Sequence, residues 1–216
     1  MGAKTWMLVC SDRSPADALR GPPSLERDAT LRFAKALFPR EKLEDTGLGA
    51  DLSYTCPPDD EINVGHFPGV AVVAAKEFGI DYPSRLSQSF LENLPHRNVY
   101  LHAMHSVVDF FGFAHWKDGK LIRSLSLSPD SGILEDIGSR LPFEEPFWSG
   151  EHPAVDPDEE PDGYPFPFHP LELGEAALRT FFGYQLEGYI DPTLVEPESI
   201  KLLRLKRIKQ RWKFWA

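Results

Sequence analysis

Three of the chain's seven histidines stand in one aromatic stretch, YLHAMHSVVDFFGFAHW, which spans residues 100–116. His102, His105 and Asp109 occupy positions i, i+3 and i+7 of this stretch. On a helix these side chains would share a face, where two imidazoles and a carboxylate can bind zinc or ferrous iron. On a strand, His102 would point to the opposite face from the other two.

The residues around the histidines favour the strand, because Val, Phe, Tyr and Trp predominate and no helix cap precedes them. We therefore expect His102 and His105 to face opposite ways, and we expect no metal and no cofactor. One continuous strand would place His105, Asp109 and His115 on a common face. A bulge or break near Ser106 would instead leave His105 and Asp109 as a hydrogen-bonded pair.

A second group of candidate residues lies in LPFEEPFW, where Glu144 and Glu145 stand between Phe143 and Phe147-Trp148. Burial among aromatic rings would raise a carboxyl pKa and suit a general base. The alternative is that the rings anchor a surface arm. The catalytic hypothesis as a whole uses His102, His105, Asp109, Glu144 and Glu145.

Residues 142–170 are rich in proline and acidic side chains and show no periodicity, which predicts a long surface loop or an arm pinned by its aromatic residues. We expect this arm to pack near the strand that carries His102 and His105. Its predicted ligand-binding residues are Phe143, Phe147, Trp148, Tyr164, Phe166 and His169.

Other sequence signatures of chemistry are absent. The chain has no C-x-x-C, no Gly-rich phosphate loop and no G-x-S-x-G nucleophile motif. The two cysteines, Cys10 and Cys56, cannot form a disulfide framework of the secreted type. Because we also find no signal peptide and no apolar run long enough to span a membrane, we expect a cytoplasmic protein.

The apolar patterns predict an α+β fold with a mainly antiparallel sheet. A central hairpin is expected at about 107–127, because two β-rich segments flank Asp118-Gly119, a dipeptide typical of tight turns. Roughly three helices are expected, at about 25–38, 83–94 and 171–186. We assign residues 1–200 to a single domain and 201–216 to a basic C-terminal extension.

The net charge of −10 is unevenly distributed. Residues 201–216 carry seven Lys or Arg and no acid, so the preceding 200 residues carry −17. A body of that charge repels nucleic acid and anionic lipid. The extension can form an amphipathic helix that binds such surfaces, or an edge strand at 199–207 whose basic side chains face the acidic body. We favour the strand.

Several motifs resemble a family of uncharacterised bacterial proteins found largely in high-GC Gram-positive bacteria. They are MGAKTWMLV, VYLHAMHSVVDFFGFAHW, RSLSLSPDSGILEDIG, LPFEEPFWSGEHP and YPFPFHPLELGEAALRTFFG. The resemblance covers most of residues 1–190 and implies a single-domain cytoplasmic protein. It implies no activity.

Taken together, these observations favour a non-catalytic domain that binds a protein or a small ligand through the aromatic, acidic arm. The alternative is a hydrolase-like or metal-dependent enzyme built on the His/Asp cluster, which requires those side chains to converge on one cleft. A third interpretation makes residues 201–216 an anchor for an anionic surface.

Overall fold

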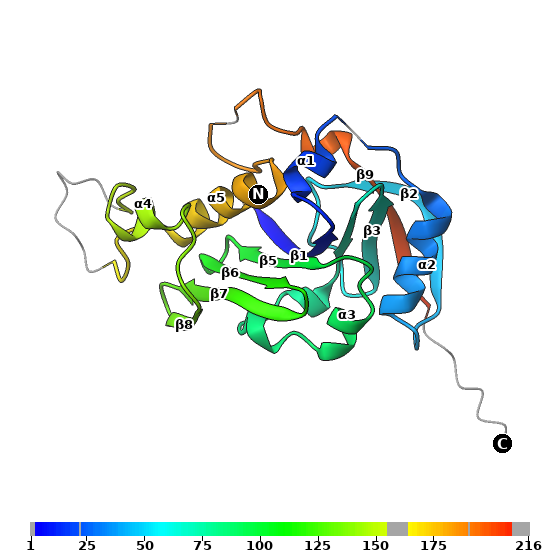
Figure 1. Ribbon diagram of the computed structural model, residues 1–216, viewed down its shortest axis with the longest axis horizontal. Helices are drawn as coiled ribbons and strands as arrows, with labels where there is room; N and C mark the ends of the chain where they lie inside the picture. Colours follow the sequence, from blue (N-terminus) through cyan, green and yellow to red (C-terminus); the bar gives the residue numbers. More distant parts are fainter. Residues whose placement is uncertain (1–2, 22, 155–163, 190, 209–216) are drawn as a thin grey trace, which may run out of the picture.

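The computed structural model describes residues 3–21, 23–154, 164–189 and 191–208 (Figure 1). In these residues the chain forms one nine-stranded sheet and five α-helices. The strands are β1 (Lys4–Ser11), β2 (Leu43–Asp51), β3 (Glu61–Phe67), β4 (Val70–Ala74), β5 (Asn98–His105), β6 (Phe110–Lys117), β7 (Lys120–Ser128), β8 (Gly132–Ile137) and β9 (Lys201–Arg207). The helices are α1 (Pro15–Leu19), α2 (Arg27–Leu37), α3 (Gln88–Glu92), α4 (Glu145–Trp148) and α5 (Pro170–Phe182), with 3-10 turns η1 (Lys76–Phe78), η2 (Pro83–Arg85) and η3 (Pro197–Ser199).

The strand order is β2-β9-β3-β4-β1-β5-β6-β7-β8, and all neighbouring strands are antiparallel. The predicted, mainly antiparallel sheet is therefore confirmed, as is the hairpin, which is formed by β6 and β7. Its turn has positive φ at both central residues, 51° at Asp118 and 75° at Gly119. Positive φ at both positions defines a type I′ turn, whose twist matches that of the strands.

Helices cover both faces of the sheet (Figure 1). Alternate residues of β1 show this clearly: Leu8 belongs to the apolar cluster that includes Phe33 of α2, and Met7 to the cluster that includes Leu178 of α5. The arm containing α4 adds a third cluster over β6 and β7 beside α5. The α5 face is the one that carries the candidate site.

The expected number of roughly three helices is too low. The helices expected at 25–38 and 171–186 correspond to α2 and α5, although α5 stops at Gly183, whose φ of 76° caps the helix. The helix expected at 83–94 is broken, because Leu86 and Ser87 have extended dihedrals between η2 and α3. The additional helices, α1 and α4, are single turns that begin at or near Pro15 and Pro146, a position that favours proline.

The sequence did not predict two of the strands, and it predicted the wrong position in the sheet for a third. β2 and β3 were not expected at all. The strand expected at 199–207 exists as β9, but it lies between β2 and β3 rather than at the sheet edge. It joins the sheet of the main domain, whereas residues 209–216 of the expected extension lie outside the described residues.

Candidate functional site

His102 is fully buried and holds helix α5 against strand β5. Its Nε2 lies 3.1 Å from the Gly174 carbonyl oxygen, which can only accept, so Nε2 carries the proton and donates. Nδ1 then accepts from the Thr5 hydroxyl at 2.6 Å. Burial lowers the pKa of His102 to about 4, which keeps the ring neutral. Through these two hydrogen bonds His102, on β5, links strand β1 to helix α5.

His105 faces the other side of the sheet, as the extended conformation predicts. Its ring stacks on Trp6, with 6.4 Å between the ring centres. Burial, followed by the nearby Lys4 charge, lowers the pKa of His105. The two imidazoles, His102 and His105, therefore do not share a cleft.

Asp109 separates from both histidines because the chain turns at 106–109 instead of continuing as one strand. Its φ is 46°, in the left-handed region that aspartate tolerates. Asp109 Oδ2 lies 3.6 Å from Nε2 of His169, at the start of α5. The alternative in which a break near Ser106 pairs Asp109 with His105 is therefore not what the structure shows. His115 pairs with Tyr100 across β5 and β6 and stacks on its ring at 4.4 Å, so it shares the face of His102 rather than that of His105.

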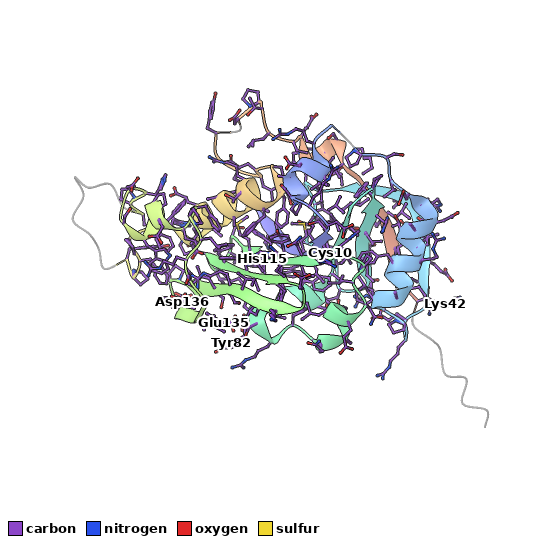
Figure 2. The ribbon with its side chains drawn as sticks, in the orientation of Figure 1. Cys10, Lys42, Tyr82, His115, Glu135 and Asp136 are labelled. Carbon is purple, nitrogen blue, oxygen red and sulfur yellow. The ribbon has the colours of Figure 1, made fainter. Side chains whose placement is uncertain are left out.

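Glu144 is committed to a buried ion pair. Its two carboxylate oxygens accept from Nε and Nη2 of Arg123 at 2.9 and 2.6 Å, and both side chains are fully buried. Nη1 of Arg123 donates to Asp136 on β8, the edge strand seen at the rim of the sheet in Figure 2. Glu145, by contrast, is exposed in the first turn of α4. The two glutamates thus point into different environments.

The aromatic side chains of the arm gather over β6 and β7, where they meet Phe111 and Phe113. The arm residues of this cluster are Phe143, Phe147, Trp148, Tyr164, Phe166 and Phe168. Tyr164 also stacks on His169, with 6.0 Å between ring centres. The six predicted ligand-binding residues are therefore brought together on one face, next to the turn that carries Asp109.

A cavity of about 700 Å³ lies between α4 and α5. Three predicted ligand-binding residues line it: Phe143, Phe147 and His169. Trp148 and Phe166 lie behind this wall, packed on Phe168. The remaining lining residues are Pro146, His152, Leu171, Glu172, Glu175, Ala176, Arg179, Thr180, Gln185, Glu187 and Gly188.

Glu175 is the titratable group of this cavity that sequence analysis missed. Burial raises its pKa to about 7, against weaker opposing effects of the backbone N–H groups of Leu186 and Glu187. Its Oε2 accepts from the Leu186 N–H at 2.8 Å. Its Oε1 is buried and has no hydrogen-bond partner among the described residues. The signal was in the sequence: Glu175 stands four residues after Leu171 and three before Leu178, within the apolar stripe of α5.

Arg179 and the loop after α5 complete the cavity. Nη2 of Arg179 donates to the side-chain carbonyl oxygen of Gln185 at 3.0 Å, and Gln185 Nε2 donates to the Glu187 carbonyl oxygen at 2.7 Å. The Glu187 carboxylate accepts from the Ala3 N–H at 2.6 Å. These bonds hold the loop that carries the polar wall of the cavity.

The basic side chains of β9 are paired with acids of the neighbouring elements. Arg204 lies 2.6 Å from the Glu61 carboxylate, and Arg207 lies 2.6 Å from that of Glu77. The two lysines of this strand approach aspartates at 3.4 to 3.5 Å. The positive charges of 201–207 therefore have partners within the protein.

The fold and the cavity define a single-sheet antiparallel α+β protein with an aromatic, acid-lined cavity on one face. The chain belongs to the family of unknown function DUF6928, whose model matches residues 5–205. Neither the curated proteins nor the solved structures contain a match to the chain. Among the described residues, no helix has the length and apolar character needed to cross a membrane, and no group of three His, Cys, Asp or Glu has the geometry to hold a metal ion.

Proposed function

We propose that this protein is a small-ligand-binding domain whose site is the cavity between α4 and α5. The observation that carries the proposal is the convergence of Phe143, Phe147 and His169, three residues of the predicted arm, on a cavity of about 700 Å³. Known ligand pockets range over roughly 300–1,000 Å³ and combine apolar walls with a few polar groups. The cavity has both properties.

The cavity is lined by apolar and by polar residues, which would contact different parts of a ligand. Phe143, Phe147 and Leu171 supply apolar surface that favours a hydrophobic ligand body. Glu175 and Arg179 lie on α5, and Gln185 and Glu187 lie in the loop that follows it, where they can orient a polar group. This division supports binding of an amphipathic small molecule.

The enzyme alternative loses support from the same geometry. A hydrolase-like or metal-dependent site on His102, His105 and Asp109 needs these groups within reach of one reacting atom. They instead lie under α5, against Trp6 and beside His169. A base role for Glu144 would require breaking its bidentate pair with Arg123. We therefore favour binding over catalysis.

The anionic-surface alternative also has less support, because the basic residues of β9 already contact carboxylates of the protein. A bacterial cytoplasmic setting remains part of our proposal. It is supported by the family resemblance and by Cys10 and Cys56, which are both free thiols.

The proposal is tested by saturation-transfer NMR with a set of small phenyl-bearing fragments that differ in charge. We expect at least one fragment to bind the full chain with a dissociation constant in the range of about 1 mM or below, as is typical for a fragment in a preformed pocket. Thr180→Trp places an indole on an exposed lining residue, so binding should weaken at least tenfold.

Leu31→Trp is the matched control, because Leu31 is a partly exposed helical residue of α2 that does not line the cavity. It should bind fragments as the wild type does. Binding that survives Thr180→Trp unchanged, or the failure of every fragment to bind, contradicts the proposed site.

A further inference from the structure

The cavity has an unequal distribution of charge. Three acidic residues line it, Glu172, Glu175 and Glu187, against one arginine, Arg179. Arg179 donates to the neutral amide of Gln185, and no carboxylate among the described residues lies within ion-pair distance of it. Among the described residues, the acids of the cavity therefore form no ion pair with its arginine.

Among these acids, Glu175 offers a specific acceptor. The side chain is 8% exposed, and its Oε1 has no donor among the described residues, although Oε2 is held by the Leu186 N–H. A buried carboxylate oxygen without a donor is unfavourable, and a charged N–H donor satisfies it best. The bond to Oε2 also fixes the orientation of the carboxylate of Glu175, a residue that lines the cavity.

The side of the cavity formed by the arm presents Phe143 and Phe147, with His152 stacked on Phe147. Aromatic faces attract cations as well as apolar groups. A ligand with an apolar body and a terminal ammonium matches both walls at once. A ligand carboxylate would meet three acidic residues and one arginine.

On the basis of the binding site proposed above, we propose that its ligand is a small organic cation, a primary amine with an aromatic or apolar body, whose ammonium group pairs with the carboxylate of Glu175. Binding selects the ionised carboxylate of Glu175 and therefore displaces its proton into the solvent at neutral pH. No covalent bond forms or breaks.

The raised pKa of Glu175, about 7, makes this binding dependent on pH. The carboxylate is mostly protonated at pH 6 and mostly ionised at pH 8, so amine affinity should rise about tenfold between these values. The titratable and charged groups around it are Glu172 and Arg179 on α5, Tyr184 and Glu187 after the helix, and His152 and His169 on the cavity wall.

The experiment compares three probes of one shape: 3-phenylpropylamine, 3-phenylpropanol and 3-phenylpropanoate. Affinities are measured by ligand-observed NMR titration with the full chain at pH 6 and pH 8. We expect the amine to bind at least tenfold more tightly than the alcohol at pH 8, and the propanoate to bind most weakly.

Glu175→Gln should remove the preference for the amine while the alcohol binds as before, because the amide oxygen still accepts from Leu186. Glu92→Gln, at an exposed position of α3, is the matched control and should behave as wild type. If Glu175→Gln fails to fold, the wild-type pH profile decides: the amine must gain affinity with pH and the alcohol must not.

Equal binding of amine and alcohol, each abolished by Thr180→Trp, would overturn the ligand class and leave the binding site intact. Tighter binding of the propanoate would overturn it in favour of an anion held by Arg179. Absence of binding by all three probes would contradict both the ligand class and the site.

Discussion

The imidazole of His102 donates to the carbonyl oxygen of Gly174, so the first histidine of the aromatic motif links the sheet to helix α5. Both ring nitrogens are used, and the side chain is fully buried. The bond fixes the middle of α5, and the same helix carries Glu175 and Arg179 on the cavity wall. His102, considered from the sequence as a catalytic residue, therefore holds in place the helix that lines the cavity.

Replacing His102 should destabilise the fold and alter its acid sensitivity. His102→Ala should lower the free energy of unfolding by about 2–4 kcal/mol, because it creates a cavity and leaves Thr5 and Gly174 without their partner. The pKa of His102 is lowered from 6.5 to about 4, so the wild type loses its contribution as pH falls from 6.5 towards 4. Denaturant unfolding at pH 7 and pH 5 should show a smaller deficit of the variant at pH 5, and an equal deficit would contradict the buried neutral ring.

Removing Glu144 should be more damaging than removing Asp136, although both carboxylates contact Arg123. Glu144→Ala leaves a fully buried guanidinium without its bidentate partner and should cost about 3–5 kcal/mol. Asp136 is 36% exposed, so water can replace it, and Asp136→Ala should cost about 1 kcal/mol. Chemical unfolding of both variants measures the difference, and similar costs would argue against a dry Arg123–Glu144 pair.

Gly174 is required because α5 approaches the sheet closely. A Cβ at this position would lie 2.6 Å from Sδ of Met104, so Gly174→Ala should cost about 1–3 kcal/mol by overpacking. Met104→Ala removes the side chain that the new methyl group would press on. The substitution Gly174→Ala should therefore lower the free energy of unfolding less in the Met104→Ala background than in the wild type. Strictly additive costs in thermal unfolding would show that the two residues do not press on each other.

The protonation of Glu175 should be visible in stability as well as in binding. Its folded pKa of about 7 exceeds its ordinary value of 4.5, so its favourable contribution is complete below pH 4.5 and is lost as pH rises through 7. Between pH 4.5 and pH 8 the wild type should lose up to about 3 kcal/mol relative to Glu175→Gln. Parallel unfolding curves of the two proteins at both pH values test this, and a constant difference would mean that the carboxyl titrates normally.

The sequence predicted elements whose apolar pattern reports burial on one face. The apolar stripe of α5 has that property, whereas the hairpin was predicted from its Asp118-Gly119 turn dipeptide. β2 was missed because this edge strand has no buried alternation and contains Gly47, whose φ is 71°. β3 was missed because its polar Glu61 and Asn63 are buried through partners far along the chain or in the preceding loop.

Part of the candidate site was predicted from the sequence, and part was not. Aromatic residues of the arm were expected to bind a ligand, and Phe143, Phe147 and His169 do line the cavity. Spacing alone grouped His105 with Asp109, but the turn at 106–109 sends Asp109 to His169. Glu175 was overlooked because only apolar residues of α5 were used to define its buried face. An acid inside an apolar stripe is the signal that would have found it.

The most direct test of the account is the location of bound amine. Chemical-shift mapping with 3-phenylpropylamine on isotope-labelled protein at pH 8 should perturb the amides of residues 171–180 and 185–188, together with those of Phe143 and Phe147. Perturbations confined to other parts of the sheet, or none at saturating amine, would contradict the claim that the cavity between α4 and α5 is the binding site.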